Sequence, residues 1–201
     1  MANTAIRPVD VTITQDWTKL IALFDSLRTR WQNNQLENGV HIPESGDCRY
    51  YFGNTGCFTT LDCVTEHAQD SALLSGAIIE AQLPWLRKLR EDFAPLDIAN
   101  VDISGMTGSF TPHVDRKPGH DGAYCRINYM LNNTAAVTYA QGLDEVESYP
   151  GHIHTAWLLD TTKTHWVDNS QSRYIFQINF HESYDTVSHW LAQHPGLAYG
   201  S

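Results

Sequence analysis

The alternation typical of a β-strand is clearest in Arg173-Tyr174-Ile175-Phe176-Gln177-Ile178-Asn179-Phe180. Its even-numbered residues are all apolar, whereas positions 173, 177 and 179 are polar. Side chains on a β-strand point alternately to opposite faces of the sheet. The pattern therefore predicts a strand with one face packed on a core and the other facing a wet cavity.

The segment Tyr124–Leu131 follows the same rule. It places Arg126 and Asn128 on one face, and the other face carries Cys125, Ile127, Tyr129 and Leu131. Turn residues separate the strands that we expect after residue 97, which are 98–104, 106–113, 123–131, 135–140, 151–160, 163–167 and 173–181. The second half of the chain is therefore predicted to be all β.

The first half is predicted to be largely helical. Apolar residues recur at helical spacing over about 15–31, which predicts an amphipathic helix. A second helical pattern covers 69–93, where Pro84 marks the start of a new segment. Residues 32–64 indicate loop and short strand, with an edge ribbon at 48–53.

Helices before a run of seven or eight strands predict a mainly β protein with flanking helices. Its core is expected to be a two-sheet jelly roll, or double-stranded β-helix, closed around a site and buttressed by the N-terminal helices. A chain of 201 residues without a linker or repeat is expected to be one domain. Within 1–201 we expect 1–96 to form the helical buttress and entrance loops, 97–181 the β-helix core and 182–201 a C-terminal tail.

Charge and composition exclude several classes of partner. The net charge of −10, from 13 basic and 23 acidic side chains, disfavours a nucleic acid or an anionic membrane surface. The first residues lack the apolar core of a signal peptide, and no apolar run is long enough for a membrane span, so we expect a cytoplasmic protein. The four cysteines form no C-x-x-C pair, which argues against a zinc site.

His113-Val114-Asp115 stands where an expected strand meets a Gly-rich turn, and His165 follows fifty residues after Asp115. Side chains two apart on a strand leave the same face, so His113 and Asp115 can aim at one point that His165 completes. Two His and one carboxylate, with three positions left open, form the preferred site of non-haem Fe(II) oxygenases. Arg173 can then clamp a carboxylate co-substrate on that iron, because guanidinium is planar and permanently charged.

From about Leu83 to Phe180 the chain resembles the Fe(II)/2-oxoglutarate-dependent oxygenases. Within them it is similar to the aspartyl/asparaginyl β-hydroxylase-like group, which includes free-proline cis-hydroxylases. The resemblance rests on Leu83-Pro84-Trp85-Leu86, Thr111-Pro112-His113-Val114-Asp115, Cys125–Leu131, Trp157-Leu158-Leu159-Asp160 and His165–Phe180. It implies iron ligation by His113, Asp115 and His165.

The resemblance also implies a co-substrate site. Arg173 would bind the distal carboxylate of 2-oxoglutarate, and Arg126 would help to hold the co-substrate. The group usually has His two residues after that Arg, and this chain has Asn128 there. Asn can donate a hydrogen bond to a carboxylate but carries no charge.

The implied activity is that of a dioxygenase that hydroxylates an amino acid, free or in a peptide, and releases succinate and CO2. It would use Fe(II), 2-oxoglutarate and O2, with ascorbate in support. The chemistry is centred on the iron, so no separate acid or base is assigned. Arg49, Arg116 and Lys117 are candidates to meet a substrate carboxylate.

Two other functions remain open. His152-Ile153-His154 offers a rival metal pair, and His165 with Asn169 fits the H-x-x-x-N of cupins. The first alternative is therefore a cupin-type metal protein with chemistry that does not use 2-oxoglutarate, although it leaves Asp115 and Arg173 unexplained. The second is a non-catalytic, metal-binding interaction module on the same fold.

Several of these residues also have ordinary structural interpretations. His152 and His154 are expected at alternating, solvent-facing strand positions, and Arg126 could pair with a buried acid such as Asp102. Six further histidines have no partner at ligand spacing and are expected at the surface: His41, His67, His120, His181, His189 and His194. Three tryptophans are expected in the core: Trp17, Trp31 and Trp85.

Overall fold

The structure is a computed structural model that describes residues 4–19, 21–22, 49–52, 56–65, 83–115, 123–168 and 171–200. The strands are β1 Ile6–Pro8, β2 Val11–Thr14, β3 Arg49–Phe52, β4 Gly56–Thr65, β5 Ile98–Gly108, β6 Phe110–His113, β7 Cys125–Met130, β8 Val137–Gln141, β9 Val146–Pro150, β10 Ala156–Asp160, β11 His165–Asp168, β12 Arg173–Phe180 and β13 Leu197–Gly200. The described helices are α3 Leu86–Asp92 and α4 Tyr184–Gln193.

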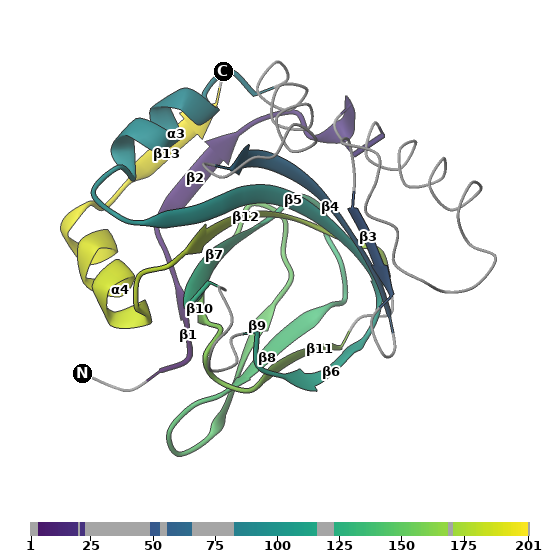
Figure 1. The fold of residues 1–201 in the computed structure, drawn as a ribbon. Coiled ribbons are helices and arrows are strands. Elements are labelled where there is room, and N and C mark those ends of the chain that lie inside the picture. The colour runs from purple at the N-terminus through teal and green to yellow at the C-terminus, as the bar shows by residue number, and fades with distance from the viewer. Residues whose placement is uncertain are drawn as a thin grey trace.

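The strands form two large facing sheets and a small one (Figure 1). The larger sheet has seven strands in the order β1-β10-β7-β12-β5-β4-β3, and the smaller has four in the order β6-β11-β8-β9. Eight consecutive strands, β5 to β12, are shared between them, with β5, β7, β10 and β12 in the larger sheet. This exchange between two sheets is the arrangement of a jelly roll, and the predicted double-stranded β-helix is confirmed.

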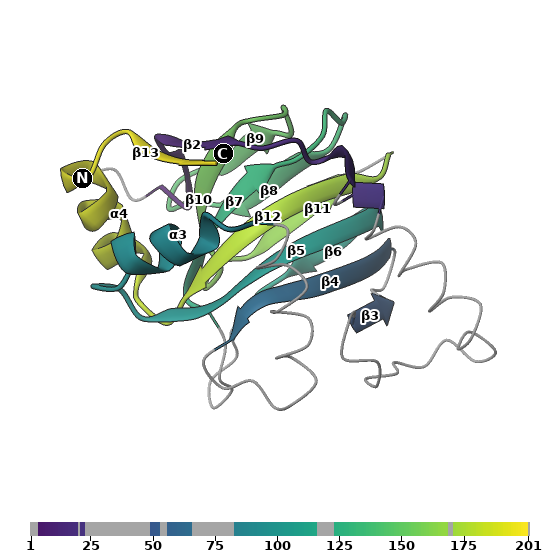
Figure 2. The same cartoon turned by 90° about the horizontal axis from the view of Figure 1, so that it is seen from above.

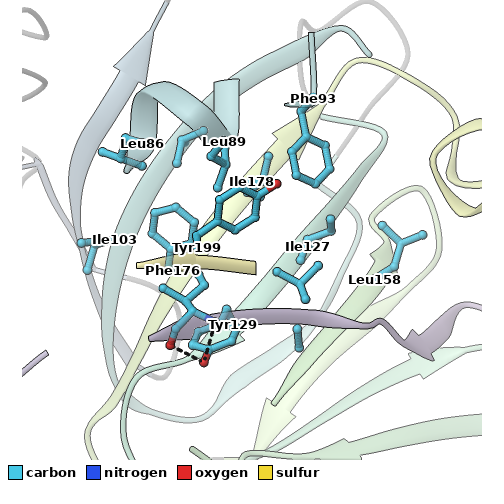
Figure 3. Packing of buried hydrophobic residues seen from close by; sticks show 14 of the residues in the cluster. Leu86, Leu89, Phe93, Ile103, Ile127, Tyr129, Leu158, Phe176, Ile178 and Tyr199 are labelled. Atoms are coloured by element: carbon cyan, nitrogen blue, oxygen red, sulfur yellow. Dashed lines mark hydrogen bonds between the residues drawn. The ribbon is translucent and has the colours of Figure 1, made fainter. Parts of the chain in front are cut away.

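Both helices lie against the outer face of the seven-stranded sheet (Figures 1 and 2). Leu86 and Leu89 of α3 and Val187 of α4 are fully buried there, and each such side chain contributes about 1.5–3 kcal/mol by leaving water. Ser183 caps α4 by accepting a hydrogen bond of 3.2 Å from the backbone N–H of Thr186. The buried apolar side chains on this face form the outer cluster. Figure 3 shows part of it, including Phe93, Ile103, Ile127, Tyr129, Leu158, Phe176, Ile178 and Tyr199.

Strand β12 has the two faces that its alternation predicts. Its apolar residues Tyr174, Phe176, Ile178 and Phe180 all belong to the outer cluster. The alternate residues therefore point between the two sheets, yet all eight residues of the strand are buried. The inner face of β12 is thus enclosed rather than broadly wetted.

A second apolar cluster fills part of the space between the sheets. This inner cluster contains residues of both sheets, namely Ala5, Ile6, Met130, Ala140, Trp157, Leu159 and Ile175. On that side, the Glu147 carboxylate of β9 accepts hydrogen bonds from the backbone N–H groups of Ala5, at 2.6 Å, and Ile6, at 2.8 Å. One side chain therefore joins the edge of the smaller sheet to the edge of the larger one.

The prediction of a strand over 151–160 is wrong for residues 151–155, because the strand begins at Ala156. Residues 151–155 form a turn in which His154 has a φ of 63°, a left-handed conformation that a strand cannot continue. The strand before that turn, β9, and the N-terminal strands β1 and β2 were not expected. The two strands predicted at 98–104 and 106–113 have a different boundary in the structure. Strand β5 runs without a break from Ile98 to Gly108, and β6 begins at Phe110.

The segment 182–201, expected to be a tail, contains α4 and β13. Strand β13 pairs in parallel with β2, and Gly200 has a φ of 129°. A Cβ at this glycine would lie 2.0 Å from the carbonyl oxygen of Thr14, so the pairing requires glycine. The buttress is therefore built from both ends of the chain rather than from the N-terminal half alone.

The predicted helices fall largely outside the described residues. Helical conformation is present at 18–19 and 21–22, within the expected 15–31, and α3 begins two residues after Pro84. Trp17 and Trp85 are buried in the outer cluster, as predicted, and Trp31 lies outside the described residues. In the described part of the chain, no helix has the length and apolar character needed to cross a membrane.

Candidate metal centre

The side chains of His113, Asp115 and His165 converge at one end of the smaller sheet. Strands β6 and β11 pair with His113 directly opposite His165, and the two ring centroids are 4.4 Å apart. Asp115 lies two residues beyond the end of β6, where its backbone N–H donates to the carbonyl of Thr161 at 3.2 Å. Its Oδ1 is 3.3 Å from His113 Nε2 and 3.4 Å from His165 Nε2.

The outer nitrogen of each imidazole is tied to the backbone. Nδ1 of His113 lies 2.7 Å from the carbonyl oxygen of Thr111, and Nδ1 of His165 lies 2.9 Å from that of Lys163. A carbonyl oxygen can only accept, so each Nδ1 donates its N–H, and each Nε2 is the ring nitrogen left to bind a metal. Both rings are therefore held in the tautomer that binds a metal through Nε2.

Burial also keeps His165 in its ligand form. Desolvation, with a further contribution from the nearby Arg126 charge, lowers the pKa of His165 to about 3. The side chains differ in exposure, at 42% for His113, 23% for Asp115 and 5% for His165. The cluster is thus anchored in the sheet at His165 and reaches solvent on the side of His113.

The donor set fits a divalent transition metal. Its three ligand atoms lie within 4.8 Å of one another, and it is the one group of at least three His, Cys, Asp or Glu with this property in the described part of the chain. Two neutral imidazoles and one carboxylate on one side of a site are the ligands that non-haem Fe(II) takes while keeping positions open.

The rival pair His152 and His154 lies apart from this cluster. Both residues are exposed in the turn between β9 and β10, and Nδ1 of His154 lies 3.1 Å from the Tyr129 hydroxyl. His189 and His194 are exposed, and His181 contacts Asp97 at 3.4 Å. Asn169, His41, His67 and His120 lie outside the described residues.

Arg126 lies beside the cluster rather than away from it. Its neighbours Cys125 and Ile127 pack in the outer cluster, so its own side chain projects between the sheets. The guanidinium forms an ion pair with Oδ2 of Asp115. The expected alternative, a pair with Asp102, concerns a side chain outside the described part.

Arg173 crosses the interior from the larger sheet to the smaller one. It is 3% exposed, and its Nη1 donates a hydrogen bond of 2.8 Å to the hydroxyl of Thr138 on β8. Burial, with the charge of Arg126, lowers the pKa of Arg173 to about 10, which leaves it cationic at neutral pH. Thr138 is a site residue that sequence reasoning missed, since its only signal is a place in the predicted strand 135–140.

Asn128 is engaged with the neighbouring strand. It lies directly opposite Gln177 in the register of β7 and β12, and Gln177 Nε2 donates to Asn128 Oδ1 at 2.7 Å. Arg126 lies opposite Asn179, near the end of β12, whereas Arg173 begins that strand. Arg126, beside the cluster, and Arg173 therefore lie toward opposite ends of the inner face, with the polar pair Asn128 and Gln177 and the apolar pair Met130 and Ile175 between them.

Comparisons with known proteins address the fold. No protein family model and no curated protein matches the chain. Among solved structures, AviO1 from Streptomyces viridochromogenes Tue57 is 14% identical, with a TM-score of 0.51 over 90% of this chain and 92% of that chain. The structural match shows that the two chains share a fold.

Two further solved structures match less closely. An oxidoreductase of the 2OG-Fe(II) oxygenase family from Burkholderia pseudomallei is 12% identical, with a TM-score of 0.46 over 83% of this chain and 81% of that chain. A prolyl-4-hydroxylase from Pseudomonas putida is 10% identical, with a TM-score of 0.44 over 89% and 94% of the two chains.

Proposed function

We propose that this protein is an Fe(II)/2-oxoglutarate-dependent dioxygenase. The observation that carries the proposal is the convergence of two imidazole Nε2 atoms and one carboxylate oxygen, with both Nδ1 atoms tied to backbone carbonyls. A site that needed only structural zinc would be expected to close its fourth position with a further ligand. This set instead opens toward solvent at His113.

In this proposal His113, Asp115 and His165 hold the iron. When bound, it would supply O2 activation coupled to the conversion of 2-oxoglutarate to succinate and CO2. The protein's own task is to orient both imidazoles and, through burial, to keep His165 neutral. The backbone contacts of the two Nδ1 atoms serve that purpose, because a rotated ring would turn Nε2 away from the metal.

Arg173 and Thr138 are suited to the distal carboxylate of 2-oxoglutarate. A buried guanidinium favours an anion strongly, and the Thr138 hydroxyl already lies within hydrogen-bond distance of it. Arg126 and Asn128, farther along the same inner face, stay predicted as further co-substrate contacts. The inner cluster, which includes Met130 and Ile175, keeps water away from this side of the interior.

The substrate we propose is an amino acid, free or within a peptide, and the reaction a hydroxylation. The support is the resemblance of the stretch 83–180 to the aspartyl/asparaginyl β-hydroxylase-like group, together with a net charge of −10 that disfavours nucleic acids. Arg116 and Lys117, proposed to meet a substrate carboxylate, lie outside the described residues. Arg49 begins β3, whose backbone is described.

The test is a screen of purified protein with Fe(II), ascorbate, O2 and 2-oxoglutarate against free amino acids and short peptides. We expect one class to stimulate succinate formation and to gain one oxygen atom by mass spectrometry. If a nucleobase or lipid does so instead, the proposed substrate class is wrong while the oxygenase survives.

The same assay separates the alternatives. His113→Ala should abolish turnover, and the matched control His152→Ala, an exposed histidine of the rival pair, should leave it unchanged. Absence of 2-oxoglutarate turnover, together with metal binding that is lost in His152→Ala but kept in His113→Ala, would favour a cupin-type site at His152 and His154. Metal binding at His113 without any turnover of 2-oxoglutarate would favour the interaction module.

A further inference from the structure

The two oxygen atoms of Asp115 have different partners. Oδ1 faces both imidazoles, at 3.3 Å from His113 Nε2 and 3.4 Å from His165 Nε2. Oδ2 is paired with the Arg126 guanidinium. The carboxylate therefore presents one oxygen to the metal centre, and a cation holds the other.

Arg126 is well placed to fix this orientation. Asp115 lies beyond the end of β6, so the sheet does not hold its side chain directly, and its backbone N–H donates a hydrogen bond to the carbonyl of Thr161. Arg126, in contrast, lies within β7, between two neighbours in the larger sheet. The pair is partly shielded, with side-chain exposures of 18% for Arg126 and 23% for Asp115, and charge-assisted hydrogen bonds are strong in such places.

We propose that Arg126 is a positioning residue that holds Asp115 by Oδ2, so that Asp115 binds the metal through Oδ1 alone. The proposal rests on the proposed function only in taking the cluster to bind a divalent metal. Binding through a single oxygen uses one coordination position rather than two. With two histidines it leaves three positions open, the number that a chelating co-substrate and O2 require together.

Positioning and charge predict opposite effects on metal affinity. A cation beside the centre repels a divalent metal, so a purely electrostatic Arg126 would weaken metal binding, and its removal would tighten it. If Arg126 orients the ligand, its removal weakens metal binding, and the loss of such a supporting contact typically costs about 10- to 100-fold in affinity.

The test is Co(II) titration without 2-oxoglutarate, followed by the absorption bands of the bound metal, on Arg126→Gln and Arg173→Gln. Both variants remove one positive charge from the same interior, but Arg173 bonds to Thr138 rather than to Asp115. We expect Arg126→Gln to bind Co(II) at least about 10-fold more weakly than Arg173→Gln. We also expect its Co(II) spectrum alone to change, because the freed carboxylate alters the coordination.

Equal affinities and identical spectra in the two variants would overturn the positioning role, as would tighter binding by Arg126→Gln. Should Arg126→Gln fail to fold, Arg126→Lys retains the charge but loses the planar fork, and the same spectral change is expected. A wild-type protein that binds Co(II) no better than His113→Ala would instead refute the metal centre itself. The two failures are therefore distinguishable.

Discussion

His113 and His165 lie opposite each other on paired strands, and the register of that pair sets the 4.4 Å between their rings. Residues that are 52 positions apart in the chain thus meet because β6 and β11 are adjacent in the smaller sheet. The register shifts between His165 and Val167, and such irregularities often re-aim side chains next to functional sites.

Arg173→Ala should weaken 2-oxoglutarate binding at least about tenfold. A charge-assisted contact of this kind is worth about 1.5–3 kcal/mol, and Arg173 is buried away from solvent. Binding of 2-oxoglutarate to the Mn(II)-loaded protein can be measured calorimetrically, with Mn(II) affinity as the internal control. Wild-type affinity for 2-oxoglutarate in the variant would remove Arg173 from the co-substrate site.

Glu147→Ala should destabilise the fold by about 1–3 kcal/mol, because two partly buried N–H groups, of Ala5 and Ile6, lose their acceptor. The matched control is Glu145→Ala, an exposed acid of the same hairpin. Chemical denaturation measures both free energies of unfolding. Equal values for the two variants would show that Glu147 does not join the sheet edges in solution.

Stability should fall when the pH rises above about 10. Burial raises the pKa of Tyr129 above its usual value of 10.0, so the unfolded chain loses this proton at a lower pH than the folded one. The stability that the buried, neutral hydroxyl contributes is complete below about pH 10 and is lost as the pH rises through the raised pKa of the folded state. In Tyr129→Phe the alkaline fall should be smaller, whereas Tyr139→Phe, a partly exposed ring stacked on Trp166, serves as the control. An unchanged alkaline slope in Tyr129→Phe would contradict this origin.

Cys125 should resist alkylation in the folded protein. Its thiol is fully buried, and burial, with the charges of Asp160 and Glu182, raises its pKa. Since the thiolate is the reactive form, iodoacetamide at neutral pH should modify it only after unfolding. Peptide mass spectrometry of native and denatured samples measures this, and rapid native labelling would show that the strand opens readily.

Local patterns were sufficient to predict the core strands and the cluster. The alternation in β12 distinguishes its two faces, and H-x-D at a strand end predicts where His113 and Asp115 lie. The triad does not depend on both residues being in the strand, because Asp115 follows it and turns back toward His165. The sequence therefore predicted that the three side chains meet, but not that β6 ends before Asp115.

Other parts could not be read from local patterns. Strand β9, Val146–Pro150, alternates exposed and half-buried residues and has no apolar face, since its place is set by pairing with β8. The partner of Arg126 depends on how the chain returns after β6, so the sequence alone could not choose Asp115 over Asp102. Helix α4 had a detectable signal in its Ser183 cap and in Val187 and Leu191, one turn apart.

In the proposed function, the cluster of His113, His165 and Asp115 forms an iron site that supports the turnover of 2-oxoglutarate. The most direct measurement is Fe(II)-dependent succinate formation by the wild-type protein and by Asp115→Ala, with circular dichroism to verify that the variant is folded. We predict Fe(II)-dependent succinate formation by the wild type and its loss in the variant. A folded Asp115→Ala protein with full activity would show that Asp115 is not a ligand of the catalytic iron.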